Sequence, residues 1–146
     1  MAAMPGTKRN TLNLDQCPCA GRHLEKFLQP ALLSALAGEP LHGYLLVQRL
    51  AAMPMFQDHA PDPTGVYRFL NAMARRGLVK SEWDLSRSGP AKRLFHLTPA
   101  GRKCLAQWIA TLERYRWQLD QMLGALRQAV ASTPAKPPAR KCRCGE

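Results

Sequence analysis

Residues 61–79 read PDPTGVYRFLNAMARRGLV, and this stretch decides the fold. Its apolar side chains recur at spacings of three and four, which places them on one buried face of a helix. They are Val66, Phe69, Leu70 and Met73. Pro63 suits a first helical turn, and Asp62 or Thr64 can cap the free backbone donors. Gly77 is placed to end the helix, so a short helix with one core-facing side is predicted.

The chain as a whole is short and basic. It has 146 residues, with 21 Lys and Arg against 10 Asp and Glu, a formal net charge of +11. That length fits one domain, and that charge favours a polyanionic partner, with nucleic acid first. An anionic membrane surface would exert the same attraction, but no apolar run approaches the roughly 20 residues that span a bilayer. The start, MAAMPGTKRN, lacks a secretory apolar region, so a cytoplasmic protein with reduced cysteines is expected.

Two further helices are predicted before residue 61. Residues 22–37 carry apolar side chains at helical spacing: Leu24, Phe27, Leu28, Ala31, Leu32, Ala35 and Leu36. Pro30 is expected to bend or restart this helix because its ring removes a backbone donor. Residues 41–53 supply the second helix, with Leu45, Leu46, Val47 and Leu50 available for burial. The sequence His42-Gly43-Tyr44 is expected to shape the start of that helix rather than to do chemistry.

Two alternating segments follow the helix of the opening stretch. Residues 78–83 and 93–98, separated by Ser88-Gly89-Pro90, predict a β-hairpin. Its tip is expected to be basic, through Arg87, Lys92 and Arg93. Three helices and a basic hairpin predict a mainly α winged helix-turn-helix, in which the last helix enters the DNA major groove and the hairpin touches the adjacent backbone.

In this fold the polar face of residues 63–75 becomes the DNA-reading face. Thr64, Arg68 and Asn71 are predicted to read base edges. Arg75, Lys92 and Arg93 are predicted to bind DNA as well, the last two as phosphate contacts. Tyr67 has two interpretations: a DNA contact, or a half-buried packing residue with its hydroxyl in water.

Several spaced motifs resemble the PadR family of bacterial transcriptional regulators. They are LHGYLLVQRL at 41–50, PTGVYRFLNAMARRGLV at 63–79, a wing containing Gly-Pro, and LTPAGRKCL at 97–105. The resemblance covers roughly residues 24–125 and implies a DNA-binding transcriptional regulator, with repression as the expected sign. Arg68 stands where the family commonly has proline, and AKRLFH replaces the usual wing sequence, so base preference does not carry over.

A fourth helix is predicted over residues 99–130, with Thr98 as N-cap and Pro99 at the first position. Its apolar stripe comprises Leu105, Trp108, Ile109, Leu112, Tyr115, Leu119, Met122 and Leu126. At 1.5 Å per residue the stripe is about 45 Å long and outruns a winged-helix core. The resemblance implies that this helix and the first form a homodimer, and two-fold symmetry predicts an inverted-repeat operator. Trp108 is an alternative effector site, for a flat, drug-like aromatic ligand at the dimer interface, although an aromatic there is commonly an anchor.

The predicted organisation has four parts: an arm over residues 1–20, a winged-helix domain over 21–98, the dimerisation helix over 99–130 and a basic, proline-rich tail over 131–146. The arm holds Cys17 and Cys19, and the tail holds Cys142 and Cys144. Four thiolates suit a tetrahedral zinc ion or an iron–sulfur cluster. A thiol–disulfide switch and inert cysteines remain alternatives, and Cys104 is expected to pack beside the apolar stripe.

No arrangement typical of an enzyme competes with this interpretation. The sequence has no Gly-rich phosphate loop and no nucleophile with a placed base, and its carboxylates are scattered. The competing class is a winged-helix adaptor that binds protein, in which the positive charge serves solubility alone. Salt dependence separates the two, because neutralising phosphates makes binding fall steeply with ionic strength.

Overall fold

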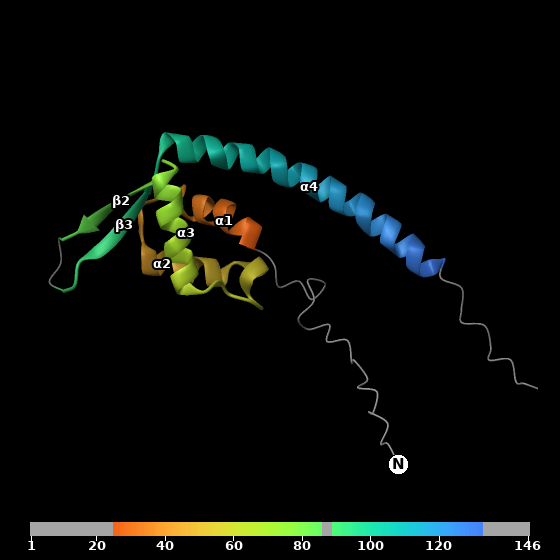
Figure 1. The fold of residues 1–146 in the computed structure, drawn as a ribbon, viewed down its shortest axis with the longest axis horizontal. Coiled ribbons are helices and arrows are strands. Elements are labelled where there is room, and N and C mark those ends of the chain that lie inside the picture. Colours follow the sequence, from red (N-terminus) through yellow and green to blue (C-terminus); the bar gives the residue numbers. More distant parts are fainter. Residues whose placement is uncertain (1–24, 86–88, 133–146) are drawn as a thin grey trace, which may run out of the picture. The chain divides into compact units, whose positions relative to one another are not determined.

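The computed structural model describes residues 25–85 and 89–132. The chain divides into two compact units, one ending at Leu105 and the other beginning at Ala106. Within the described residues, the first unit contains short helices, a three-stranded antiparallel sheet and the start of a long helix (Figure 1). The second unit contains the rest of that long helix. The protein is therefore mainly helical with one small sheet, as predicted.

The first helix is shorter than its sequence pattern. A 3₁₀ turn, η3 (Glu25–Phe27), leads into α1 (Leu28–Leu36). The change of geometry falls two residues before Pro30, which therefore lies in the first turn of α1, where a missing N–H breaks no intrahelical bond. Leu24, part of the predicted face, lies outside the described residues. Leu32 and Leu33 are fully buried, and most other residues of α1 are buried with them.

A strand precedes the second helix, where the sequence predicts helix from residue 41. Strand β1 (Leu41–His42) pairs with β3 (Lys92–Leu97), Leu41 opposite Phe95, and α2 (Gly43–Ala52) begins directly after it. The prediction is wrong for these two residues because so short a strand shows no periodicity and forms only when β3 offers its edge. The predicted apolar residues of α2 differ in burial. Leu46 and Leu50 are fully buried, whereas Leu45 and Val47 are half-buried.

The helix of the opening stretch begins where predicted. After α2 the 3₁₀ turn η4 (Pro54–Phe56) leads through a loop to α3 (Pro63–Arg75). The Asp62 carboxylate caps α3 by accepting a hydrogen bond from the Gly65 N–H at 2.9 Å. This bond satisfies one of the free N–H groups of the first turn.

Gly77 ends α3, as predicted. Its φ of +78° lies in the left-handed region that glycine adopts without strain. The Gly77 N–H donates to the Ala74 carbonyl and the Leu78 N–H donates to the Met73 carbonyl, both at 3.0 Å. These two bonds form a Schellman motif, which turns the chain from the helix into the next strand.

One face of α3 is buried in the core of the first unit. Val66, Leu70 and Met73 are at most 1% exposed. Phe69 is half-buried, so its prediction as a core residue is wrong. Its position at the edge of the apolar stripe explains the difference, because only the centre of the stripe is covered.

The predicted hairpin is present. Strand β2 (Val79–Asp84) pairs with β3 from Val79 opposite Leu97 to Asp84 opposite Lys92, giving the sheet order β1-β3-β2. Leu41, Val79 and Phe95 are buried on the inner face. Arg93 shares that face because side chains alternate along a strand. It pairs with Trp83, one residue pair before the hairpin loop, so it lies near the tip but faces inward. Arg87 lies outside the described residues.

The long helix α4 (Pro99–Ala131) agrees with the prediction. Thr98 caps it: the hydroxyl oxygen accepts a hydrogen bond from the Gly101 N–H at 3.0 Å. Gly101 allows the first turn to approach the Leu78 carbonyl, where a Cβ would overlap. None of the helices in the part of the chain that the structure describes has the length and apolarity of a membrane span.

Candidate nucleic-acid interface

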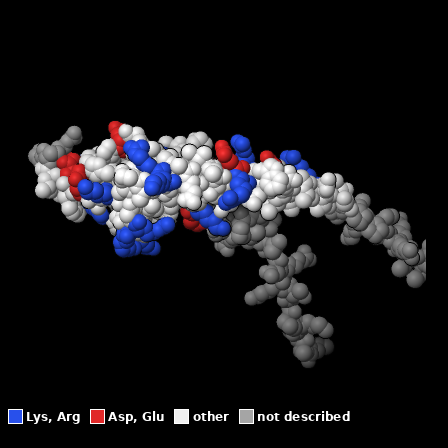
Figure 2. All heavy atoms as spheres, turned by 90° about the horizontal axis from the view of Figure 1, so that it is seen from above, with Lys and Arg blue, Asp and Glu red and all other residues white. Residues whose placement is uncertain are grey.

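The outer face of α3 is polar, basic and largely free. Thr64, Arg68 and Arg75 are exposed, while Tyr67 and Asn71 are half-buried. Among the described residues, neither Arg68 nor Arg75 has a hydrogen-bond or ion-pair partner. Two unpaired guanidinium groups on one helix face supply donors suited to phosphate oxygens and to guanine. Figure 2 shows that Lys and Arg outnumber Asp and Glu on the face of the molecule seen there.

Tyr67 is half-buried and packs against a neighbouring helix. Its ring lies against the backbone of Gly43, where a Cβ would overlap the ring. The side chain thus packs at the junction of α2 and α3, which also explains why position 43 is a glycine. Because Tyr67 is only half-buried, it lines a surface pocket as well. Its ring helps hold the two helices together and remains accessible from outside.

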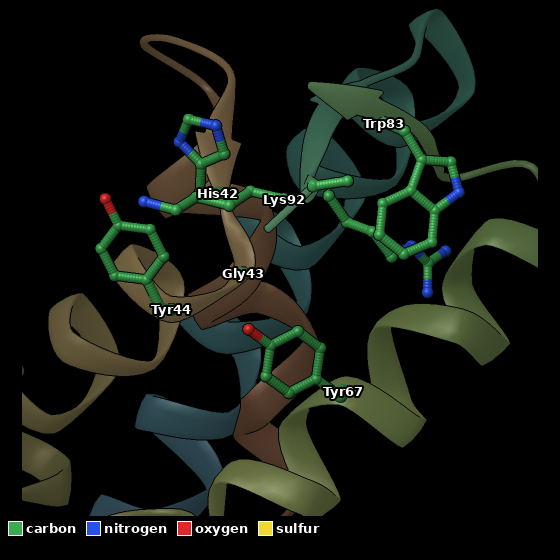
Figure 3. Close-up of a pocket in the computed structure, with 8 residues that line it drawn as sticks. His42, Gly43, Tyr44, Tyr67, Trp83 and Lys92 are labelled. Atoms are coloured by element: carbon green, nitrogen blue, oxygen red, sulfur yellow. The ribbon is translucent and has the colours of Figure 1, made fainter. Parts of the chain in front are cut away.

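A pocket of about 270 Å³ lies between the start of α2, α3 and the hairpin. Its walls include His42, Tyr44, Tyr67, Trp83 and Lys92 (Figure 3). The Lys92 ammonium lies 5.0 Å from the centroid of the Tyr44 ring, a cation–π distance. The sequence predicts functional roles for Lys92 and Tyr67 but carries no sign that His42, Tyr44 and Trp83 lie beside them. Their shared location depends on the β1–β3 pairing, which has no signal in the sequence.

The hairpin is fastened to the rest of the unit by polar contacts. His42 Nε2 and Asp84 Oδ2 are 2.9 Å apart and connect β1 to the end of β2. The His42 ring also stacks on Tyr44, with centroids 5.8 Å apart. His42 is the N-cap residue of α2, but its side chain makes no capping hydrogen bond. These contacts tie the loop end of the hairpin to β1 and the start of α2.

Arg93 faces α3 from the inner side of the sheet. Its guanidinium donates from Nη1 to Asn71 Oδ1 and from Nη2 to Ser81 Oγ, each at 2.7 Å. Of the predicted DNA-binding residues, the structure places Thr64, Arg68 and Arg75 on the free face and Lys92 at the wing. Arg93 and Asn71 are joined to each other.

The predicted metal ligands Cys17, Cys19, Cys142 and Cys144 lie outside the described residues. Within residues 25–85 and 89–132, no group of three or more His, Cys, Asp or Glu side chains could hold a metal ion. Cys104 is half-buried, and its Sγ accepts a hydrogen bond from Gln29 Nε2 at 3.2 Å. This contact suits the packing role predicted for Cys104.

While Leu105 belongs to the first unit, the second unit carries the apolar stripe predicted for dimerisation from Trp108 onward. Several of its large apolar side chains are exposed: Ile109, Tyr115, Trp117, Leu119, Met122, Leu123, Leu126 and Val130. Trp108, the predicted effector residue, is half-buried.

A helix-turn-helix whose second helix presents a free basic face, with a β-hairpin attached beside it, defines a winged helix-turn-helix protein. Residues 32–107 match the Transcriptional regulator PadR-like family. The match spans about half of the 146-residue chain, and the chain belongs to this family. The family consists of transcriptional regulators, as the resemblance implied, and not of enzymes. No curated protein is similar enough to be counted as a relative.

Solved structures share the fold. The protein TA0346 of Thermoplasma acidophilum is 29% identical, with a TM-score of 0.56 over 68% of this chain and 92% of its own. A PadR family transcriptional regulator of Eggerthella lenta is 24% identical, with a TM-score of 0.57 over 67% of this chain and 82% of its own. PadR of Bacillus subtilis, solved in complex with operator DNA, is 21% identical, with a TM-score of 0.51 over 56% of this chain and 47% of its own.

Proposed function

We propose that this chain is a DNA-binding transcriptional repressor that acts as a homodimer on an inverted-repeat operator. The observation that carries the proposal is the free basic face of α3, where Arg68 and Arg75 are exposed and unpaired among the described residues. Lys92 on the adjacent wing supplies a cation for the flanking phosphates. The PadR of Bacillus subtilis, which has the same fold, was solved with operator DNA, and this supports the same class of partner here.

The test is binding to an operator fragment at several salt concentrations, followed by fluorescence anisotropy. If the protein binds duplex DNA, the logarithm of its binding constant should fall linearly with the logarithm of the salt concentration. The slope should be about −0.9 for each phosphate neutralised. Arg68→Ala and Arg75→Ala should each weaken binding about tenfold, because each removes a cation from the contact face. Arg49→Ala is the matched control, since Arg49 is already paired with Glu39. Unchanged affinity in both test variants, or salt-independent binding, would favour the protein-binding adaptor instead.

The homodimer part of the proposal rests on the exposed stripe of α4. Leu119 is 59% exposed and Met122 is 60% exposed in the single chain. Apolar side chains that recur along a helix and face water mark an interaction surface. A second copy of the same helix presents the same stripe and satisfies the symmetry of a closed dimer. In the aromatic-ligand alternative, a ligand would enter this seam beside Trp108 and alter its fluorescence.

A sensing role for the terminal cysteines is a separate proposal that the four thiols in two Cys-x-Cys pairs support. Protein purified without air should contain zinc or a coloured iron–sulfur cluster, and a Cys142→Ser/Cys144→Ser double variant should lose it. Cys104→Ser, the matched control, should keep it. The same metal content in the double variant and the wild type would remove the metal site from the proposal without touching DNA binding.

A further inference from the structure

Arg93 connects the hairpin to α3 through one side chain of that helix, Asn71. The Arg93 guanidinium donates to Asn71 Oδ1 on α3 and to Ser81 Oγ on β2, each at 2.7 Å. It also lies over the Phe95 ring, 5.1 Å from the centroid. Arg93 is half-buried, and these contacts hold its planar group in one orientation.

The chemistry of the guanidinium determines how the Asn71 amide is oriented. Arginine has five N–H donors and no acceptor, so the atom of Asn71 that faces it must be the carbonyl oxygen. Turning the amide over would place two donor groups against each other and break a charge-assisted hydrogen bond. The Nδ2 group consequently points away from Arg93, and in the described part of the chain it has no hydrogen-bond partner. Asn71 therefore presents donors, and not an acceptor, to whatever docks on α3.

We propose that Arg93 makes Asn71 a donor-only reader and that Asn71 thereby selects guanine over adenine. This inference rests on the proposed function. An asparagine that reads adenine must accept from N6 and donate to N7 at the same time, which requires its carbonyl oxygen to face the base. Guanine presents two acceptors, N7 and O6, on its major-groove edge and needs donors alone. Arg93 is in this view a positioning residue that acts through Asn71.

The experiment selects DNA from a random duplex library with the full-length protein and sequences the enriched sites. Asn71→Ala identifies the base pair read by Asn71, as the position at which the wild-type preference disappears. At that position the wild type should favour guanine over adenine by about tenfold. In Arg93→Met the amide is free to turn, so the ratio should fall to about twofold or less while other positions keep their preferences.

Two further variants keep the test decisive if Arg93→Met proves unstable. Asn71→Asp retains a partner for Arg93 but presents only acceptors, so the preferred base should change from guanine to cytosine, whose N4 amino group is a donor. Ser81→Ala removes one bond of Arg93 without touching Asn71, and its guanine preference should stay within about twofold of the wild type.

The outcomes separate the inference from the proposed function. Enriched sites with adenine at the Asn71-dependent position, or an Asn71→Ala profile identical to that of the wild type, would overturn the donor-only reader and leave DNA binding intact. A wild-type protein that enriches no sequence would overturn both. Guanine in the wild type together with cytosine in Asn71→Asp would establish the inference.

Discussion

The two units of the chain differ in whether their apolar side chains are buried. In the unit that ends at Leu105, Leu46, Leu70 and Phe95 are fully buried. In the described part of the unit that begins at Ala106, Leu119 and Met122 are 59% and 60% exposed. Both regions have helical apolar periodicity, yet only the first covers its own stripe. Periodicity therefore shows that a face will be buried, and the tertiary fold decides whether the same chain buries it.

The largest expected effect is in the covered core. Leu70→Ala should lower the free energy of unfolding by about 2–5 kcal/mol, because it removes a fully buried side chain and leaves a cavity. Urea unfolding followed by circular dichroism measures the loss, which should be the same at low and high protein concentration. A strong dependence of that loss on protein concentration would mean that the first unit does not stabilise itself.

The next effect concerns the uncovered stripe. Leu119→Glu places a charge where the proposed dimer buries an apolar side chain, and two-fold symmetry introduces it twice. The dimer should lose about 3 kcal/mol or more of association free energy, seen as monomer in analytical ultracentrifugation, while the monomer keeps its helix content. Gln118→Glu is the neighbouring control with the same added charge. If Leu119→Glu self-associates like the wild type, a partner helix does not cover the exposed stripe of the second unit at this position.

The smallest effects are expected when the same substitution, glycine to alanine, is made once in each unit. Gly101→Ala should destabilise the protein by about 1–2 kcal/mol, because the added Cβ would overlap the Leu78 carbonyl in the first turn of α4. Gly124→Ala meets no atom within 4 Å in the single chain. It should instead stabilise the helix by up to about 1 kcal/mol, since alanine restricts the unfolded chain and favours helix. Thermal unfolding of both variants gives the two signs, and a destabilising Gly124→Ala would place the partner helix close to that position.

The sequence predicted those parts of the fold that depend on local chemistry. The helix over residues 63–75, its Asp62 cap and its stop at Gly77 all follow from side-chain types at fixed spacing, and the structure confirms them. Strand β1 was missed because two residues carry no period and its formation depends on β3. Phe69 was assigned to the core from spacing alone, which cannot tell the centre of a stripe from its edge.

The candidate site was predicted only in part. The sequence identified Arg68 and Arg75 as residues of the polar face of α3, and the structure places both on the free surface. It could not show that Arg93 turns inward to Asn71, because the orientation of a strand residue depends on strand register and on its inner neighbours. The sequence had no signal for the contact of Tyr67 with Gly43, which only the docking of α2 on α3 creates.

The Thr98 hydroxyl joins two helix ends with one group. Its oxygen lies 2.6 Å from the Gly77 carbonyl and 2.9 Å from the Leu78 carbonyl, and it also accepts from the Gly101 N–H. The glycine that ends α3 and the first turn of α4 are thus both hydrogen-bonded to the Thr98 hydroxyl. The Thr98 N–H adds a bond to the Leu78 carbonyl at 3.3 Å, so a rotation of the first turn of α4 would act on the end of α3 directly at Thr98.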